Sequence, residues 1–302
     1  MSLYNELCTQ INGRWRKNVP MKNYTTMRVG GPADLLISPE SIEEVSMLIS
    51  WLTKNSVYHL VLGAGSNLIV RDGGIRGVVI STRDSFNYFR IHEHTIVTGA
   101  GTSIATLSAV ALRAELSGLE FAGGIPGTIG GAVKINAGAF DCSISDVLQE
   151  VKIVDRMGII RTKKKEELSN RYRESCINES DMIVEAELTL IPEKKEEINK
   201  KVLLFTNWRK SHQPMKLASA GCVFKNPHGM HAGKLIDDLG LKGLRYGDAA
   251  VSDVHANFIV NHGSAKASDI LMLMDKVREK VMNETGIDLI PEVIVVGEDT
   301  NA

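Results

Sequence analysis

The spacing of apolar residues predicts several amphipathic helices along the chain. Residues 41–55 place apolar side chains three and four positions apart, and Ser41 and Glu44 at their start are typical of a capping box. We therefore expect a capped helix there that buries one face. The same spacing predicts helices over residues 103–116 (ended by Gly118), from Pro192 to about Arg209, over 232–239, and over 268–285 (ended by Gly286).

Short apolar runs between these segments predict strands. Residues 58–62 are expected to form a buried strand. Strands are also expected over 68–70, after a glycine-rich stretch, and over 78–80, after the turn signal RDGG at 71–74. The basic run RTKKKEE at 161–167 predicts a turn. Further strand-like runs lie at 151–155, 182–190, 221–224, 256–261 and 291–296.

The order of these elements predicts an α+β fold, because strand-rich pieces and helices are interspersed. The polar sequence RKSHQP near residue 210 predicts a domain boundary. We expect one domain over 1–210, divided into two subdomains near 85–95, and a second domain over 211–302. A chain of 302 residues is long enough for this division.

Composition and charge limit the classes of partner that the protein is expected to bind. The chain is 43% apolar and 24% charged with a net charge of −1, so no bulk charge favours nucleic acid or an anionic membrane. Its four cysteines lie far apart without metal-ligand spacing, and no run approaches the ~18 apolar residues needed to span a bilayer. We therefore expect reduced thiols, no metal site and a cytoplasmic protein, and any anionic ligand must be bound locally.

The sequence GAGSN at 63–67 links one predicted strand to the next. A dinucleotide fingerprint needs a third glycine and a following helix, but Leu68 takes the glycine position and a strand-like run follows. A Rossmann crossover is therefore disfavoured. The loop can still bind phosphate through main-chain N–H groups and the side chains of Ser66 and Asn67, or it can be a tight turn without a ligand.

A second stretch, GGIPGTIGGAVKINAGAF at 123–140, is also dense in glycine. Glycine loses the most backbone entropy on folding, so such density predicts close approach of the backbone to a bulky ligand. Pro126 stiffens one turn, and Thr128 and Asn136 can bind a phosphate or a heteroaromatic ring. Two such loops favour a large phosphate-containing cofactor over closely packed turns without one.

A series of motifs in order resembles the UDP-N-acetylenolpyruvoylglucosamine reductase family, also called UDP-N-acetylmuramate dehydrogenase or MurB. They cover nearly the whole chain. The chain resembles the compact members, which lack an extra tyrosine-bearing loop. The motifs are NYTTMRVGGPAD (23–34), LGAGSNLIV (62–70) with IPGTIGGAV and NAGAF, YRES (172–175), SAGCVFKNP (219–227), HAGKLIDDLGLKG (231–243), VHANFIVN (254–261) and PEVIVVG (291–297).

The resemblance implies a PCMH-type, vanillyl-alcohol-oxidase-like FAD domain of two subdomains, followed by an α+β substrate domain. It implies that NADPH reduces non-covalent FAD, which then reduces the enolpyruvyl ether of UDP-N-acetylglucosamine in peptidoglycan precursor synthesis. Hydride goes to the β-carbon and a proton to the α-carbon. We expect a UDP-sugar substrate, no nucleic acid or membrane partner, and a monomer.

The resemblance also assigns three catalytic residues. Arg173 matches an arginine whose planar guanidinium suits a carboxylate gaining charge, although Arg171 is a near alternative and either can simply face solvent. Glu292 matches the catalytic glutamate, the alternative being a strand-end carboxylate in water. Cys222 stands where relatives usually have serine as proton donor, and a thiol with an ordinary pKa near ~8.5 can donate a proton at neutral pH. Composition alone favours a buried, inert thiol at this position.

The remaining assignments are binding residues. Lys225 and Asn226 are expected to contact the sugar or phosphates, and His255 takes a position where relatives place a substrate-binding amide. Arg28 and Arg209 can be surface charges, and Ile183 can be ordinary core. The expected FAD-binding residues are Arg28, Gly63, Ala64, Gly65, Ser66, Asn67, Gly123, Pro126, Gly127, Thr128, Gly130, Gly131, Asn136, Ala137, Ile183 and Arg209.

Two other functions stay open at this level. A different PCMH-type flavin oxidase would use the same FAD half on a small alcohol or sugar acid, but it gives no reason for SAGCVFKNP and PEV, and no flavin tether is evident. A non-enzymatic nucleotide-binding protein would need the glycine loops alone.

Overall fold

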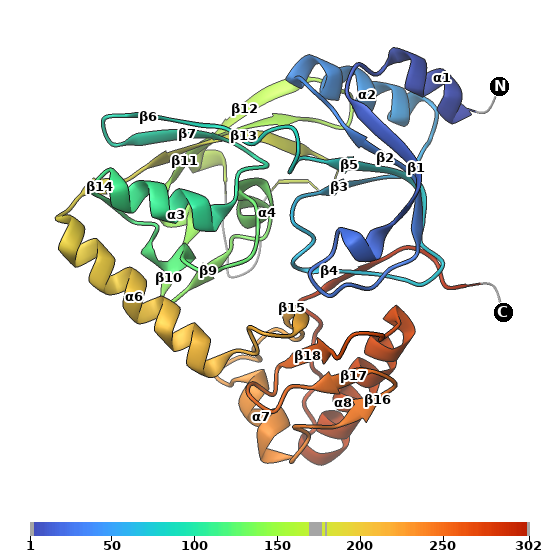
Figure 1. The fold of residues 1–302 in the computed structure, drawn as a ribbon, viewed down its shortest axis with the longest axis vertical. Coiled ribbons are helices and arrows are strands. Elements are labelled where there is room, and N and C mark those ends of the chain that lie inside the picture. The colour runs from blue at the N-terminus through green and yellow to red at the C-terminus, as the bar shows by residue number, and fades with distance from the viewer. Residues whose placement is uncertain (1–2, 169–176, 179, 301–302) are drawn as a thin grey trace. The chain divides into compact units, whose positions relative to one another are not determined.

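The computed structural model describes residues 3–168, 177–178 and 180–300 and combines helices with several small sheets (Figure 1). The α+β class predicted from the sequence is therefore confirmed. The chain forms two compact units, each built from three segments. The first unit comprises Met1–Lys17, Leu35–Ala64 and Gly77–Asn207, and the second comprises Asn18–Asp34, Gly65–Arg76 and Trp208–Ala302.

A five-stranded antiparallel sheet organises the first unit, and the helices α3 and α4 pack against one of its faces (Figure 1). Residues of the central strands pack with α3 and α4 into a core that includes Leu107, Ile129 and Leu188. The sheet order is β12 (Ile160–Lys164), β11 (Leu148–Val154), β13 (Met182–Thr189), β7 (Thr95–Gly99) and β6 (Phe89–His92). The helices are α3 (Ile104–Arg113), α4 (Ile129–Lys134), α5 (Ile144–Val147) and α6 (Lys195–His212), and the short strands are β8 (Leu116–Ser117), β9 (Gly138–Ala139), β10 (Cys142–Ser143) and β14 (Ile191–Pro192).

A second core cluster lies beside a four-stranded sheet of order β1-β2-β5-β3. It joins Leu7 of the N-terminal helix and Leu48 of α2 to strand residues such as Ile37 and Ile80, all within the first unit. The elements are α1 (Leu3–Gln10), β1 (Arg14–Pro20), β2 (Pro32–Ser38), α2 (Ile42–Lys54), β3 (His59–Leu62) and β5 (Ile75–Ser81).

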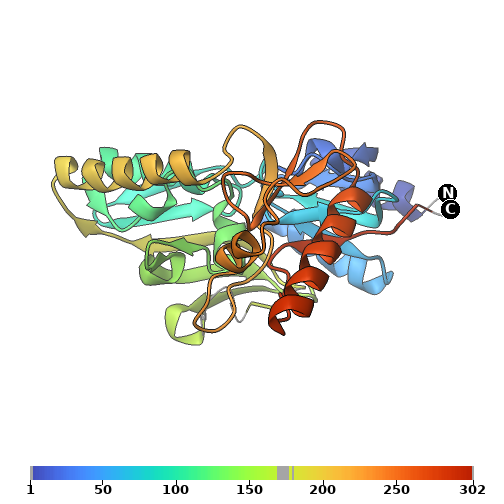
Figure 2. The same cartoon turned by 90° about the horizontal axis from the view of Figure 1, so that it is seen from below.

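The second unit contains a four-stranded antiparallel sheet covered by α8, the red helix in Figure 2. Leu273 and Val277 of that helix are fully buried in the unit's core. Gly286 ends the helix in the left-handed conformation with φ of 71°, as the sequence predicts. The elements are β4 (Leu68–Val70), β15 (Ala218–Cys222), α7 (Ala232–Asp238), β16 (Arg245–Tyr246), β17 (Ala249–Val251), β18 (Phe258–Asn261), α8 (Ala267–Thr285) and β19 (Ile294–Val296).

Three local predictions are wrong. Residues 161–164 of the basic run expected to turn lie in β12, and only 165–167 form a 3₁₀ turn. The turn between β11 and β12 comes earlier, where the Asp155 carboxylate accepts hydrogen bonds from the N–H groups of Met157 and Ile159. The helix expected over 103–116 ends at Arg113, because Leu116 and Ser117 pair with β14. The strand expected to be buried, β3, lies at a sheet edge and is half-buried over most of its length.

The start of α2 confirms only half of the expected capping box. The Ser41 side chain accepts a hydrogen bond from the N–H of Glu44, as predicted. The Glu44 carboxylate instead binds the main-chain N–H groups of Asn12, Gly13 and Glu40. This buried carboxylate therefore fastens the segment after α1 to the start of α2. No helix in the described ranges is long and apolar enough to cross a membrane.

Candidate functional site

The GAGSN loop runs from β3 to β4, so its predicted strand-to-strand position is confirmed. Gly65 has φ of +61°, and a Cβ at this position would lie 2.1 Å from the carbonyl oxygen of Tyr24. The main-chain N–H of Thr26 donates to the Gly65 carbonyl at 3.2 Å. Glycine is thus required at residue 65 by the protein's own packing, whether or not a ligand binds.

Helix α4 begins within the second glycine-rich stretch, 123–140, and the glycines around it are packed as closely as Gly65. A Cβ on Gly63 would lie 2.3 Å from the hydroxyl oxygen of Thr128, and one on Gly130 would lie 2.9 Å from Cβ of Ala100. Thr128 is buried, and its hydroxyl oxygen accepts a hydrogen bond from the N–H of Gly131. Close approach of a ligand is therefore not needed to explain Gly63 or Gly130, contrary to the reason given from the sequence.

Gly131 differs from these glycines. It is exposed, and among the atoms around it a Cβ would meet only the Thr128 hydroxyl, at an ordinary 3.6 Å. The space beside residue 131 is therefore open to a bound group. The residues of both loops fit a phosphate-containing cofactor, because residues 63–67 and 123–137 contain hydroxyl, amide and main-chain donors and no carboxylate.

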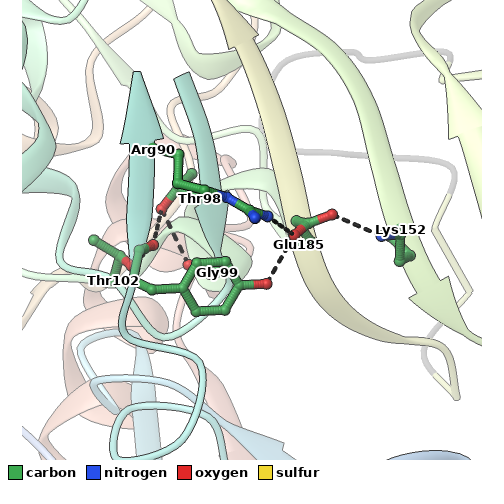
Figure 3. A network of polar contacts seen from close by, with 7 residues as sticks. Arg90, Thr98, Gly99, Thr102, Lys152 and Glu185 are labelled. Atoms are coloured by element: carbon green, nitrogen blue, oxygen red, sulfur yellow. Dashed lines mark hydrogen bonds and ion pairs between the residues drawn. The ribbon is translucent and has the colours of Figure 1, made fainter. Parts of the chain in front are cut away.

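Ile183 lies in a strand held by a polar network. Two residues beyond it in β13, Glu185 accepts hydrogen bonds from Tyr88 (2.8 Å) and Lys152 (2.7 Å) and lies 3.6 Å from Arg90 (Figure 3). Burial would raise the pKa of Glu185, but these neighbours outweigh it and hold the pKa below its ordinary value. Burial, with the hydrogen bond to Glu185, raises the pKa of Tyr88 to about 12. Ile183 itself is buried in the first unit's core.

In the second unit, the strand that ends at Cys222 lies beside the segment that carries Glu292. The main-chain N–H of Glu292 donates to the Val223 carbonyl at 2.7 Å, and that of Lys225 donates to the Ile290 carbonyl at 2.8 Å. Gly221, with φ of +79°, shifts the register of β15 just before Cys222, which then pairs with Phe258. Cys222 and Glu292 are both half-buried. The structure thus places the segments that carry two of the predicted catalytic residues side by side.

Asn257 is a site residue that sequence reasoning missed. Its buried amide accepts a hydrogen bond from the N–H of Phe224 (3.0 Å) and donates one to the Phe224 carbonyl (2.8 Å). Its own carbonyl accepts from the N–H of Val223. Asn257 therefore fixes the backbone that follows Cys222. The only available signal was an asparagine within the apolar run VHANFIVN.

His255 is held by the same residue. Its Nδ1 accepts a hydrogen bond from the main-chain N–H of Asn257 (3.2 Å), and its ring meets the edge of Phe258 with centroids 4.9 Å apart. Burial, and then the charge of Lys242, lower the pKa of His255. The neutral ring therefore carries its proton on Nε2 and presents a hydrogen-bond donor there.

The other predicted binding residues are distributed more widely. Lys225 is half-buried, whereas Asn226 is exposed and its Oδ1 accepts from the N–H of Ala232, at the start of α7. Arg28 is exposed with φ of +59°. Arg209 is only 4% exposed, so it is not a surface charge, and burial lowers its pKa. Arg173 and its alternative Arg171 lie outside the residues that the structure describes.

The predicted cofactor residues fall in both units. Gly63, Ala64, Gly123, Pro126, Gly127, Thr128, Gly130, Gly131, Asn136, Ala137 and Ile183 belong to the first, and Arg28, Gly65, Ser66, Asn67 and Arg209 to the second. Within the second unit, Asn67 also contacts the segment of Glu292, because its side-chain N–H donates to the carbonyl of that residue at 3.1 Å. Its amide thus has a protein partner in addition to any ligand.

Two sequence families match the chain. The model of the UDP-N-acetylenolpyruvoylglucosamine reductase C-terminal domain matches residues 213–296, and that of an FAD-binding domain matches residues 33–163. These matches agree with the prediction of an FAD-binding domain that contains glycine loops, followed by a C-terminal substrate domain.

Several named proteins are similar to this chain over nearly its whole length. UDP-N-acetylenolpyruvoylglucosamine reductase of Clostridium tetani is 42% identical, with 94% of this chain and 92% of the relative covered. The protein of that name from Carboxydothermus hydrogenoformans is 42% identical, with 98% of each covered. The crystal structure of UDP-N-acetylenolpyruvylglucosamine reductase (MurB) from Thermus caldophilus is 39% identical, with a TM-score of 0.82, and covers 95% of this chain and 100% of its own.

Proposed function

The chain belongs to the UDP-N-acetylenolpyruvoylglucosamine reductase family, flavoprotein oxidoreductases that contain FAD, and from this premise we propose the reaction that it catalyses. NADPH supplies the electrons to reduce the enolpyruvyl ether of UDP-N-acetylglucosamine to UDP-N-acetylmuramate. A hydride is added to the β-carbon and a proton to the α-carbon, so one NADPH and one proton are consumed for each double bond reduced. This step belongs to peptidoglycan precursor synthesis.

FAD, when bound, would take up a hydride from NADPH and pass it to the substrate's β-carbon. We propose that it is held non-covalently by the two glycine loops, with Arg28 and Arg209 supplying positive charge. Gly131 is the loop residue with the most direct support, because the space beside it is open. No carboxylate in either loop opposes the cofactor's phosphates.

We propose that Cys222 donates the proton to the α-carbon and that Arg173 and Glu292 stabilise the charge that develops on the substrate's carboxylate side. A thiol is a much stronger acid than an alkyl hydroxyl, so cysteine is a chemically suitable donor at this position. Lys225, Asn226 and the Nε2–H of His255 are proposed to bind the UDP-sugar.

One observation carries this proposal. The main-chain bond between Glu292 and Val223 places the carboxylate-bearing segment beside the thiol-bearing strand, as protonation and charge stabilisation on one substrate would require. A flavin oxidase acting on an alcohol has no need for this pair. A nucleotide-binding protein without catalysis needs neither residue.

Purified protein tests the proposal directly. It should be yellow, lose its flavin absorption band when NADPH is added without oxygen, and regain the band with enolpyruvyl-UDP-N-acetylglucosamine. A flavin that is reduced by a small alcohol and reoxidised by oxygen, with no reoxidation by the enolpyruvyl substrate, would rule out the proposed reaction. A colourless protein that binds no FAD would rule out flavin chemistry altogether.

The remaining features stay predictions. We propose that the protein works in the cytoplasm as a monomer on a small UDP-sugar, without nucleic-acid or membrane partners. The domain division at residue 210, with subdomains meeting near 85–95, likewise stays a prediction.

A further inference from the structure

Thr26 connects the GAGSN loop to the strand that carries Cys222. Its main-chain N–H donates to the carbonyl of Gly65 at 3.2 Å, and its side-chain hydroxyl donates to the carbonyl of Ser219 at 2.7 Å. Ser219 lies three positions before Cys222 in β15. A single residue thus bonds to the glycine loop with one group and to the catalytic strand with the other.

Asn67 makes the corresponding connection to Glu292. Its carbonyl accepts a hydrogen bond from the N–H of Ile294 at 2.9 Å, and its side-chain N–H donates to the carbonyl of Glu292 at 3.1 Å. The parallel pairing of β4 with β19 continues this contact from Leu68 onward. The loop therefore has one connection to the thiol strand and another to the carboxylate segment, all within the second unit.

The turn that carries Thr26 is itself fixed. Its neighbour Met27 is fully buried, and the Met27 carbonyl accepts a hydrogen bond from the buried amide of Asn261 at 3.0 Å. Gly65 can approach the turn because it lacks a Cβ, which would collide with the Tyr24 carbonyl. Thr26 therefore holds its two partners from a rigid position.

We propose that Thr26 is a positioning residue of the reaction, which sets the separation between the GAGSN loop and Cys222. The inference rests on the proposed function, in which a hydride and a proton must reach adjacent carbons of one substrate. Reacting groups must be held to within about 1 Å, and a misplacement of that size can cost about 100-fold in rate. Asn67 sets the separation between the GAGSN loop and Glu292 in the same way.

The chain provides a matched control in the preceding residue. The hydroxyl of Thr25 also donates to a main-chain carbonyl, that of Val29 at 2.9 Å, but this bond stays within the turn. Thr25→Val and Thr26→Val therefore each remove one threonine hydroxyl bond. Only the second removes a bond to the catalytic strand, and Thr26→Ser keeps that bond.

The test compares these holoenzymes with the wild type in three measurements: flavin reduction by NADPH, flavin reoxidation by enolpyruvyl-UDP-N-acetylglucosamine, and amide hydrogen exchange over residues 219–224. Thr26→Val should slow reoxidation by about 10- to 100-fold while NADPH reduction and FAD content stay within about twofold. Exchange over 219–224 should rise about fivefold, as expected for the loss of one hydrogen bond. Thr25→Val should show neither effect, and Thr26→Ser should behave as the wild type.

Three results would overturn the inference: unchanged reoxidation in Thr26→Val, equal slowing in Thr25→Val, or equal slowing of both half-reactions. If Thr26→Val does not fold, Thr26→Ala removes the same hydroxyl without placing a methyl group against the Ser219 carbonyl, and it carries the same comparison. Failure of the wild type to be reoxidised by the substrate would refute the proposed function instead. The exchange comparison would still decide whether Thr26 holds the strand.

Discussion

Glu292 is bonded through its main-chain N–H to the carbonyl of Val223, the residue after Cys222, at 2.7 Å. The bond belongs to the pairing that sets the register of the two segments, and a slip of one segment by one residue would turn the side chains of that segment to the opposite face. It uses only the main chain. Substitutions of the Cys222 or Glu292 side chain therefore leave it in place, so they can test chemistry separately from folding.

Cys222→Ala should separate the two halves of the reaction. The variant should keep its FAD and be reduced by NADPH at close to the wild-type rate, because neither step uses the thiol. Overall turnover should fall by about 10²- to 10⁴-fold, the usual contribution of a positioned proton donor. Stopped-flow absorbance of the flavin measures both half-reactions in one preparation.

Cys222→Ser provides the matched control for this prediction. A hydroxyl can occupy the same position and donate a proton, so at least part of the activity should remain. Normal turnover in Cys222→Ala would show that the proton comes from another group. Equal loss in the serine and alanine variants would point instead to a specific need for sulfur.

The two kinds of glycine in the loops should respond differently to alanine. In Gly131→Ala the new Cβ meets only the Thr128 hydroxyl at 3.6 Å, so the apoprotein should be as stable as the wild type or up to ~1 kcal/mol more stable. FAD affinity should still fall about tenfold or more, equivalent to ~1.4 kcal/mol, if the cofactor lies against this residue. Urea unfolding of the apoprotein and FAD titration check the two halves.

Gly65→Ala is the comparison for this experiment. Its Cβ would collide with the Tyr24 carbonyl, and φ of +61° disfavours any side chain, so both stability and FAD binding should fall. If Gly131→Ala binds FAD normally, the open space beside residue 131 is not part of the cofactor site.

Local sequence signals predicted part of this fold well. Ser41 and Gly286 marked helix ends because capping depends on residues next to one another in the chain. The strand-to-strand setting of GAGSN could be predicted for the same reason. The charged strand β12 could not, since an edge strand exposed to water carries no apolar pattern to reveal it.

The sequence predicted residues of the candidate site, but not the hydrogen bonds between distant residues that hold the site together. The family resemblance identified Cys222 and Glu292, whose segments the structure places side by side. The roles of Thr26 and Asn257 depend on partners far away in the sequence, and a threonine or asparagine gives no local sign of such a partner. For the same reason, the glycine pattern could not distinguish Gly65, which the protein's own packing requires, from Gly131.

His255 should give the protein an acid-sensitive stability. Its pKa lies below the ordinary value, so as the pH falls below about 6.5 the unfolded chain takes up the proton before the folded one does. Its contribution is therefore fully present above about pH 6.5 and is lost as the pH falls through the folded-state pKa. Protonation also removes the acceptor for the N–H of Asn257.

His255→Asn isolates this effect, because its Oδ1 can replace Nδ1 as the acceptor and does not titrate. The urea midpoint should decrease less between pH 7.5 and 5.5 in the variant than in the wild type. His59 contributes with the same sign, since burial lowers its pKa too, so His59→Gln should flatten the profile independently. An unchanged profile in His255→Asn would mean that the pKa of His255 is the same in the folded and the unfolded protein.

The Glu44 carboxylate should stabilise the N-terminal part of the first unit. It is buried, and its oxygens accept hydrogen bonds from the N–H groups of Asn12 (2.6 Å), Gly13 (2.9 Å) and Glu40 (2.5 Å). Glu44→Gln replaces one oxygen by an amide that faces a donor, so the free energy of unfolding should fall by about 1–3 kcal/mol. Glu43→Gln, which changes the exposed neighbour, should alter it by no more than ~0.5 kcal/mol. Hydrogen exchange should rise over α1 and residues 12–13 in the first variant alone, and equal stability of the two variants would refute the anchoring role.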